Sequence, residues 1–312
     1  MPKLSFIVTS YNYAQYIEEC IESILAQTYQ NIEIIVVDDH SRDNSVEVVN
    51  SIIRNHKSEI NIKLIPHKST KGQLASIFDG ILAASGDFIA CIASDDRLSK
   101  DFALTHMAIH LFQNTALSVC ELYEIDEKST LTTLNSNIIP KTNNGTLINE
   151  IKVKINDLNV KSIVKILDKK ANHFGGWWWA PLSCAVFRKS TILPFLTFDK
   201  LNNWRYNPEK ILFNFLHLIG GSIKIYEPLV GYRSFGHNAG GATPILGNIN
   251  YNIDEVKKNY LKTQFNLFND TIYFFQKEKN NLINLYSKNK YSKLLKEIYF
   301  AIPKLLKQKF SL

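Results

Sequence analysis

Four short apolar runs, each followed by polar residues, divide the first 120 residues of the chain into a repeating pattern. These runs cover residues 4–8, 32–37, 62–65 and 88–93. They are rich in Ile and Val and are too short for helices, so they predict buried strands. Between them, apolar residues recur every three or four positions, as in amphipathic helices, over residues 17–25, 46–53 and 74–82. Strands that alternate with helices predict an α/β fold with a mostly parallel sheet and helices on both faces.

The later part of the chain is less regular. Residues 125–170 are polar and weakly periodic, which predicts an insertion or a lid. Further elements are expected as a strand over 183–188, a helix over 208–218 and short strands over 223–226 and 229–232.

Positive charge is concentrated at the C-terminal end. Residues 251–312 hold 12 Lys, no Arg and five acidic residues, and this excess equals the whole net charge of +7. Within residues 291–312, Leu and Ile recur at helical spacing with Lys between them. Such a basic amphipathic helix either lies on an anionic membrane surface or packs on the protein with its lysines in water. Nucleic acid is not expected as a partner, because the tail lacks Arg and any recognised motif.

The cysteines and the N-terminus bear on the compartment. Cys20, Cys91, Cys120 and Cys184 are far apart, which predicts buried free thiols in a reducing environment and argues against a zinc site. The first apolar stretch ends at Thr9 and is too short for a signal peptide. No apolar run approaches the roughly 18–20 residues that span a bilayer. We therefore expect a cytoplasmic protein, with the tail allowing peripheral attachment to the inner face of the cytoplasmic membrane.

Polar residues gather where three predicted strands end, at Tyr11-Asn12, Asp38-Asp39 and Asp95-Asp96. Ligands of open α/β sheets bind at this edge, so a shared site is expected there. Asp95-Asp96 suits Mg²⁺ or Mn²⁺, which could neutralise a diphosphate, although a turn or helix cap is the alternative. Asp39 can accept a hydrogen bond from an N–H of a base.

A helix start at Lys71-Gly72-Gln73 combines small residues with a helix N-terminus. This arrangement allows a diphosphate or a sugar to approach the backbone, so Lys71 and Gln73 join the predicted nucleotide site. An ordinary helix start is the alternative.

The order and spacing of these segments resemble the GT-A glycosyltransferases of family 2. The resemblance runs from Leu4 to Asn12, through Ser23 to Tyr29 and Glu33 to Ser41, and from Gly72 to Asp96. About 100 residues match closely, and weaker similarity extends to about residue 240. The resemblance implies a GT-A fold with a Rossmann-like, mostly parallel sheet and, here, a helical C-terminal extension.

The resemblance also implies an activity. Members of this family use a nucleotide-diphosphate sugar, usually UDP-linked, and invert the anomeric carbon. Thr9, Tyr11 and Asp39 match positions that hold the nucleoside, with Asp39 at the base. Asp96 would ligate the metal, and Asp95 would touch the ribose or a metal-bound water. Ala93 stands where the commoner motif has its first acidic residue, which leaves fewer carboxylates for the metal.

An inverting transfer needs a general base, and the sequence offers two. Glu209 falls where the family's Asp base sits, near the start of the helix over 208–218, with Pro208 replacing an acidic neighbour. Its alternative role is a helix N-terminal carboxylate favoured by the helix dipole. Asp199 is the other candidate base.

Three more groups are predicted to face the substrates. Arg233 and His237 resemble the family's Tyr-Arg-x-x-His region near the diphosphate, where His237 could ligate the metal or contact a phosphate; a surface histidine is the alternative. Nearby glycines suggest a loop that closes over the donor. Trp177, Trp178 and Trp179 are expected to form a platform for the acceptor sugar, against plain core packing.

These observations favour an inverting, metal-dependent glycosyltransferase acting on a glycan or lipid-linked acceptor in the synthesis of a capsule, a lipooligosaccharide or another bacterial surface polysaccharide. We expect a catalytic domain over residues 1–245, with a nucleotide-binding half (1–120) and an acceptor-binding half (121–245), and a helical basic extension over 246–312. A non-catalytic sugar- or nucleotide-binding relative and a nucleotidyltransferase are the alternatives.

Overall fold

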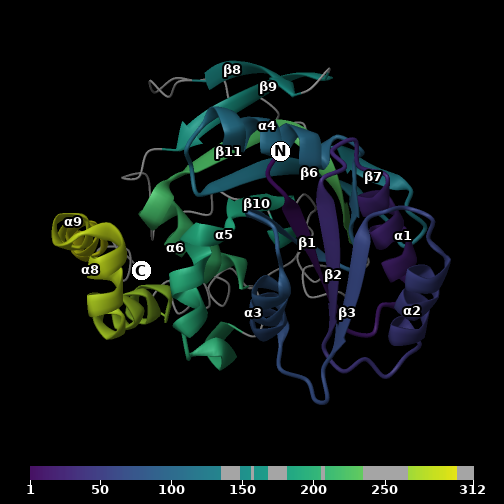
Figure 1. Ribbon diagram of the computed structural model, residues 1–312, viewed down its shortest axis with the longest axis horizontal. Coiled ribbons are helices and arrows are strands. Elements are labelled where there is room, and N and C mark those ends of the chain that lie inside the picture. The colour runs from purple at the N-terminus through teal and green to yellow at the C-terminus, as the bar shows by residue number, and fades with distance from the viewer. Residues whose placement is uncertain (135–147, 156–157, 168–180, 205–207, 235–265, 301–312) are drawn as a thin grey trace, which may run out of the picture.

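The computed structural model describes residues 1–134, 148–155, 158–167, 181–204, 208–234 and 266–300. Within these ranges, one mixed sheet carries helices on its two faces (Figure 1). Its strands are β1 (Leu4–Ser10), β2 (Ile32–Asp38), β3 (Asn61–Pro66), β4 (Phe88–Ala93), β5 (Arg97–Leu98), β6 (Leu117–Ile125), β7 (Leu131–Leu134), β8 (Ile148–Ile155), β9 (Leu158–Leu167), β10 (Ala185–Arg188) and β11 (Ser222–Arg233).

The sheet order places several strand ends along one edge. The order is β3-β2-β1-β4-β10-β6-β11-β9-β8, with β5 on β11 and β7 on β6. Strands β1 to β4 pair in parallel, and β6 pairs in parallel with β11. Between these two groups runs β10, antiparallel to both β4 and β6. The carboxyl ends of β1, β2, β4, β6 and β11 therefore share an edge, as the sequence pattern predicts for the first half.

The helices of the first half match the expected periodicity. They are α1 (Ala14–Leu25), α2 (Ser45–Asn55), α3 (Gln73–Ala83) and α4 (Phe102–Phe112). Helices α1 and α2 lie on one side of β1–β3, and α3 lies on the other (Figure 1). Every residue of β1 and β2 is buried, because a parallel sheet covered on both faces leaves no solvent-facing side. The four cysteines are free and buried, as predicted.

The expected insertion over 125–170 contains strands of the main sheet. In its described part, β7 adds to β6, and the β8–β9 hairpin extends the sheet beyond β11. Alternation of Lys or Asn with Ile and Val suits the hairpin's place at the edge of the sheet, where one face meets water. The two short strands expected over 223–232 are one strand, β11, interrupted by irregular pairing around Pro228, which lacks the N–H that a regular ladder needs.

The remaining helices are α5 (Lys189–Ile192), α6 (Glu209–Gly220), α8 (Lys279–Tyr286) and α9 (Lys288–Phe300), with a further helix over residues 266–277. In the described part of the chain, no helix has the length and apolar character needed to cross a membrane.

Aromatic contacts attach the C-terminal helices to the rest of the molecule. The ring of Phe274 meets those of Phe195 and Phe215 edge to face, with centroids 5.0 and 5.4 Å apart. Asp270 accepts hydrogen bonds from Trp204 Nε1 and Asn203 Nδ2, each 3.0 Å long. The helix over 266–277 therefore packs against α6 and the segment around Phe195 and Trp204.

Candidate functional site

Asp39, directly after β2, is held by the segment that leads into α3. Its Oδ1 accepts hydrogen bonds from the backbone N–H of Lys71 at 2.7 Å and from Nδ1 of His67 at 2.9 Å. Its Oδ2 accepts one from the backbone N–H of Gly72 at 2.8 Å. Gly72 has φ 95°, a conformation that glycine adopts without strain, and this aims its N–H at the carboxylate. The predicted neighbours Asp39 and Lys71 are thus in direct contact, and Gln73 begins the helix beside them.

The loop after β1 is tied to the loop after β2. Asn12 adopts φ 57°, a left-handed conformation that Asn tolerates well. Its backbone N–H donates to Ser41 Oγ at 2.9 Å, and its Oδ1 accepts from the backbone N–H of Arg42 at 2.7 Å. Asn12 therefore fixes loop geometry with its own polar groups, while the neighbouring Tyr11 leaves its side chain 44% exposed.

Thr9 joins the same edge from inside the sheet. It is buried in β1, and its carbonyl oxygen accepts from the backbone N–H of Ser94 at 3.1 Å. This bond sets the turn that carries Asp95 and Asp96 beside the end of β1. The structure thus brings Thr9, Tyr11, Asn12, Asp39 and the Asp pair to one edge, as the sequence predicts.

The two carboxylates after β4 are buried. Asp96 Oδ2 accepts a 2.5 Å hydrogen bond from Ser183 Oγ, and its Oδ1 accepts from the backbone N–H of Arg233 at 3.0 Å. Burial, reinforced by the negative charge of Asp95, raises the pKa of the Asp96 carboxyl well above its ordinary value. A cation between the carboxylates would reverse that electrostatic penalty.

The side chain of Arg233 is buried against the Asp95–Asp96 turn. Its side chain is 1% exposed, its Nε donates to the carbonyl of Asp95 at 2.7 Å, and its Nη2 pairs with Glu19 Oε2 at 2.6 Å. The guanidinium also stacks over the ring of Tyr16, 4.4 Å from its centroid, and donates to Ser129 Oγ at 3.0 Å. These contacts indicate that Arg233 positions the Asp95–Asp96 turn, whereas its diphosphate contact stays a prediction.

Glu209 and the Asp pair both influence the hydroxyl of Tyr232. Burial is the main cause that raises the pKa of the Tyr232 hydroxyl, and the charges of Asp96, Asp95 and Glu209 add to it. Tyr232 is therefore near all three carboxylates. Burial also raises the pKa of Glu209 from 4.5 to about 7. A carboxylate with this pKa can take up a proton near neutral pH, as a general base must.

Asp199, the alternative base, has a different environment. Its Oδ2 accepts from the hydroxyl of Tyr273 at 3.0 Å and pairs with Nζ of Lys277 at 2.7 Å. The hydrogen bond from Lys277 is the largest of the effects that lower the pKa of Asp199, and its side chain is 50% exposed. An exposed, ion-paired carboxylate of lowered pKa binds a proton weakly, so the comparison favours Glu209 as the base.

The two carboxylates suit a divalent cation that takes its remaining ligands from a substrate. Asp95 and Asp96 supply hard oxygen atoms, and within the described ranges no three His, Cys, Asp or Glu side chains gather into a complete cage. Mg²⁺ and Mn²⁺ commonly bind one or two carboxylates and complete their shell with phosphate oxygens and water. The residues present therefore fit a cation that binds together with a diphosphate.

Several predicted site residues lie outside the described residues. They are His237, Trp177, Trp178 and Trp179. Their roles at the metal and at the acceptor stay predictions.

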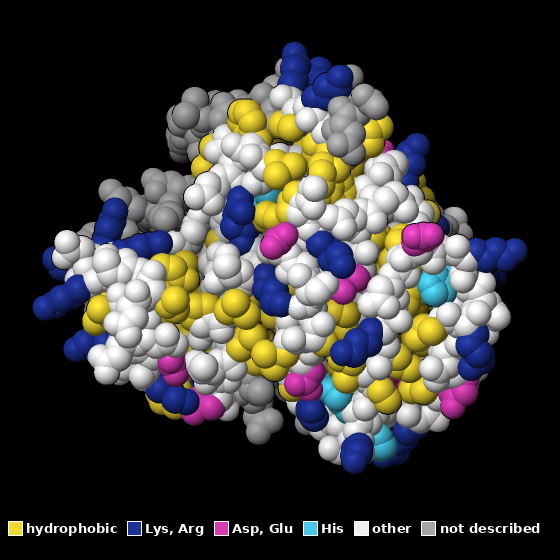
Figure 2. Space-filling model, in the orientation of Figure 1, with side chains coloured by type: hydrophobic (Ala, Val, Ile, Leu, Met, Phe, Trp, Pro, Cys, Tyr) yellow, Lys and Arg dark blue, Asp and Glu magenta, His cyan; other side chains and the backbone are white. Residues whose placement is uncertain are grey.

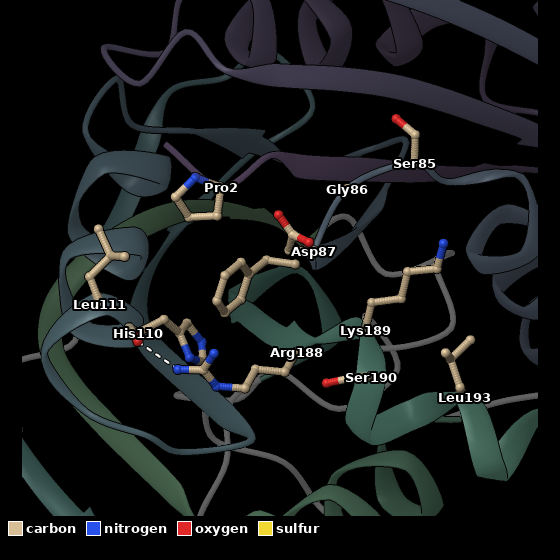
Figure 3. A pocket seen from close by; sticks show the side chains of 11 residues that line it. Pro2, Ser85, Gly86, Asp87, His110, Leu111, Arg188, Lys189, Ser190 and Leu193 are labelled. Carbon is tan, nitrogen blue, oxygen red and sulfur yellow. Dashed lines mark hydrogen bonds between the residues drawn. The ribbon is translucent and has the colours of Figure 1, made fainter.

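A surface pocket of about 700 Å³ lies at the opposite edge of the sheet, near the start of β4 (Figure 3). Arg188 faces this pocket, and its Nη2 donates to the backbone carbonyl of His110 at 2.6 Å. Lys189 and Asp87 also line it. None of the residues predicted for donor or acceptor belongs to this pocket, so it is separate from the candidate site.

Sequence reasoning missed the residues that hold the site in shape. Ser183 was placed on a strand, but its bond to Asp96 depends on how β10 inserts beside β4. Glu19 lies on the polar side of a regular helix and gives no signal of its partner Arg233. His67 follows Pro66 at a strand end, the position that identified the other polar residues, and could have been found by that rule.

The fold and site together define an α/β protein with carboxylates at the ligand-binding edge of a mostly parallel sheet. The chain belongs to glycosyl transferase family 2, whose sequence profile matches residues 5–189. It is 40% identical over 103 residues to glycosyltransferase GlyG of Streptococcus pneumoniae serotype 4, which covers 33% of each chain. It is 36% identical over 137 residues to the putative glycosyltransferase EpsH of Bacillus subtilis, covering 44% of this chain and 38% of EpsH. These matches span only about a third of the relatives' lengths.

Solved structures of low sequence identity share the fold. Staphylococcus aureus TarS 1–349, in complex with UDP-GlcNAc, superposes with a TM-score of 0.54 at 14% identity, covering 95% of this chain and 80% of that one. The mannosyltransferase PcManGT from Pyrobaculum calidifontis, in complex with GDP-Man and Mn²⁺, gives a TM-score of 0.53 at 12% identity, covering 97% and 75%. The GT-A fold expected from the sequence is thereby confirmed.

Proposed function

We propose that this chain transfers a sugar from a UDP-sugar to a hydroxyl group of a glycan or lipid-linked acceptor, with inversion at the anomeric carbon. The observation that carries this proposal is that Asp39 and the Asp95–Asp96 pair follow the carboxyl ends of β2 and β4 at one sheet edge, while the charges of Glu209 and of the pair act on the same Tyr232 hydroxyl. Membership of glycosyl transferase family 2 supports the reaction class. Synthesis of a bacterial surface polysaccharide is the proposed setting, and the similarity to the bacterial glycosyltransferases GlyG and EpsH supports a bacterial glycan as the product.

Recognition of the donor's base is assigned to Asp39. An ionised carboxylate only accepts hydrogen bonds, so it selects a base that presents an N–H, as uracil does at N3. Tyr11, whose ring is exposed, is proposed to stack on the base, and Thr9 and Asn12 are proposed to line the nucleoside site beside it. Gln73 and Lys71 border the same region at the start of α3.

Asp96, helped by Asp95, would hold a divalent cation against the donor's diphosphate. When bound, Mn²⁺ or Mg²⁺ neutralises the charge that develops on the leaving diphosphate. Ser183 and the backbone N–H of Arg233 each donate to one oxygen of Asp96, so the carboxylate is oriented before any ligand arrives. His237 is a further candidate ligand for the metal.

Glu209 would act as the base. The acceptor hydroxyl oxygen attacks the anomeric carbon, the bond from that carbon to the diphosphate oxygen breaks, and the hydroxyl proton passes to a Glu209 carboxylate oxygen. A group of pKa about 7 is ionised in a useful fraction near neutral pH and still binds the proton firmly. Trp177, Trp178 and Trp179 are proposed to bind the acceptor sugar.

The basic tail is proposed to contact an anionic membrane surface through its lysines only. In α9 the apolar side chains Tyr291, Leu294 and Ile298 are buried in the protein, which matches the packed alternative. Lysines lie on the outer side of this helix, at the left of Figure 2, where dark blue marks Lys and Arg; Lys288, Lys293 and Lys296 are exposed. Attachment would therefore be electrostatic and salt-sensitive, without insertion of the buried face.

A thermal-shift panel with UDP, GDP and CDP, each with and without Mn²⁺, tests the proposal. A ligand at 100 times its Kd stabilises the native state by about 2.7 kcal/mol, so specific binding raises Tm measurably. We expect the largest rise with UDP and Mn²⁺ together, and loss of the metal-dependent part in Asp96→Asn. Asp87→Asn, an exposed aspartate at the opposite sheet edge, is the matched control.

Turnover is then measured as UDP release from UDP-sugars in the presence of glycan or lipid-linked acceptors. UDP release that requires Asp96 and Glu209 supports the proposal. If no nucleotide shifts Tm, the nucleotide-sugar proposal fails. If UDP binds but no sugar donor turns over with any acceptor, the chain is a non-catalytic nucleotide-binding relative.

A further inference from the structure

The imidazole of His67 lies between two carboxylates behind the nucleotide-binding edge. Its Nδ1 donates to Asp39 Oδ1 at 2.9 Å, and its Nε2 lies 2.9 Å from Asp79 Oδ2 without forming a hydrogen bond to it. The ring is 3% exposed, and its own backbone N–H donates to the Asp38 carbonyl at 2.8 Å. Hydrogen bonds of both the backbone and the ring of His67 therefore hold the imidazole in place.

Asp79 and Lys71 complete the outer side of this arrangement. Lys71 Nζ pairs with Asp79 Oδ2 at 2.8 Å, while the Lys71 backbone N–H donates to Asp39. One residue thus supplies its backbone to the inner carboxylate and its ammonium to the outer one. Because Lys71 and Asp79 are partly exposed and His67 and Asp39 are not, the outer pair shields the inner pair from solvent.

The hydrogen bonds to Asp39 leave it little capacity for a ligand. A carboxylate offers about four lone-pair sites. Within the described part of the chain three N–H groups already donate to it, two at Oδ1 and one at Oδ2. One site remains, on Oδ2. A single N–H from a base fits this vacancy, whereas a base edge with two adjacent donors, such as N1–H and N2–H of guanine, needs both oxygens.

We propose that His67 is a positioning residue that occupies Oδ1 of Asp39 and so restricts the donor's base to one with a single N–H, as in uracil. This inference rests on the proposed nucleotide-sugar function and adds to it the residue that selects the nucleotide. His67 does not touch the donor. It sets which oxygen of Asp39 is left to do so.

Three substitutions separate the roles of the two ring nitrogens. His67→Phe keeps the ring and removes both nitrogens. In His67→Gln the amide reaches toward Asp79, near the position of Nε2, and misses Asp39. In His67→Asn the shorter amide stands near the position of Nδ1 and can still donate to Asp39 Oδ1. His56→Asn is the matched control, because among the described residues the ring nitrogens of His56 hydrogen-bond to the backbone carbonyls of Ile53 and Ile60 and to no carboxylate.

The measurement is the Kd of UDP and of GDP, each with Mn²⁺, by calorimetry on the full chain, with Tm of the nucleotide-free variants as the test of folding. A hydrogen bond to a charged group changes affinity by about tenfold or more, so we expect the UDP-to-GDP affinity ratio to fall at least about fivefold in His67→Phe and His67→Gln. His67→Asn and His56→Asn should keep the wild-type ratio. A merely structural role would weaken both nucleotides equally and leave the ratio unchanged.

An unchanged ratio in folded His67→Phe or His67→Gln overturns the inference while the proposed function stands. Should His67→Phe fail to fold, His67→Gln against His67→Asn gives the same comparison. Failure of the wild-type chain to bind either nucleotide overturns the proposed function and this inference with it. A wild-type preference for GDP overturns this inference and the choice of UDP, while the nucleotide-sugar reaction class stands.

Discussion

Glu209→Gln is expected to lower kcat by about 10²–10⁴-fold and, at the same time, to make the protein more stable above neutral pH. Glu209 begins α6 with its side chain partly buried, and burial raises its pKa from 4.5 to about 7. The folded state therefore holds this proton more tightly than the unfolded chain does. Such a group makes its full contribution to the free energy of unfolding below pH 4.5. That contribution falls as the pH rises toward 7, because the folded state disfavours the ionised carboxylate.

The size of the effect follows from that difference in pKa. Each pKa unit corresponds to about 1.4 kcal/mol, so a fully desolvated carboxylate would cost about 3 kcal/mol. Because Glu209 keeps partial contact with water, we expect Glu209→Gln to raise the free energy of unfolding at pH 8 by about 1–2 kcal/mol. A gain of this size raises Tm by a few degrees in a chain of this length. At pH 4.5 the gain should vanish.

Catalysis should respond in the opposite direction. Loss of a general base commonly lowers kcat by about 10²–10⁴-fold. With pKa about 7, roughly a tenth of Glu209 is ionised at pH 6 and nine tenths at pH 8, so wild-type kcat/KM should rise about tenfold over that range. The residual activity of Glu209→Gln should lack this rise.

The assays are urea unfolding at pH 4.5 and 8 and sugar transfer from pH 5.5 to 8.5. Glu47→Gln is the matched control, since Glu47 is an exposed acid in the first turn of α2 and loses the same helix-terminal charge. Wild-type activity in Glu209→Gln would refute the assignment of the base. Equal stability of the variant and the wild type at pH 8 would refute the burial argument.

Three further outcomes are expected from the structure. Arg233→Lys should lower the free energy of unfolding of the nucleotide-free protein by about 2–3 kcal/mol in urea, because an ammonium cannot reach Glu19 and the backbone carbonyls together. Unchanged stability with weaker UDP binding would instead indicate that the guanidinium contacts the diphosphate. Gly220→Ala should cost about 1–3 kcal/mol, measured in the same way, because its Cβ would lie 2.4 Å from the Cβ of Ala116, and unaltered unfolding would contradict this packing. Replacing the three exposed lysines of α9 with Gln should weaken flotation with anionic liposomes by about 100-fold, at roughly 1 kcal/mol per charge, without lowering Tm; equal flotation of the variant and the wild type would exclude this face. The lysines are Lys288, Lys293 and Lys296.

The sequence predicts the fold's first half closely because local periodicity decides it. Strands β1 to β4 begin within a residue of the expected positions. Asp39 and Asp96 follow β2 and β4, and they lie at one edge because the carboxyl ends of parallel strands align in a sheet. The β8–β9 hairpin was missed because its apolar residues alternate with Lys and Asn, which resembles a polar loop when strand partners are unknown.

The sequence also does not show which partners the buried polar side chains meet. The resemblance puts Arg233 near the diphosphate, but the sequence gives no sign that its guanidinium, at the end of β11, pairs with Glu19 on α1. Periodicity fixes which face of a strand a residue occupies, but a buried arginine is satisfied by partners distant in sequence, and no local pattern encodes them. The same holds for Ser183 and Asp96, which meet only because β10 inserts antiparallel between β4 and β6.

The long separation between Asp96 and its partners has a consequence for how the protein matures during synthesis. Ser183 lies 87 residues after Asp96, and Arg233 lies 137 residues after it. Strands β1 to β4 and the loops around Asp39 can form as soon as about a third of the chain has left the ribosome, since their contacts are among themselves. At that stage the loops around Asp39 exist, but the Asp95–Asp96 turn still awaits Ser183 and Arg233. The hydrogen bonds that orient the Asp96 carboxylate therefore form last, when β10 and β11 dock, so under the proposed function a nascent chain would hold a base before it could hold a diphosphate.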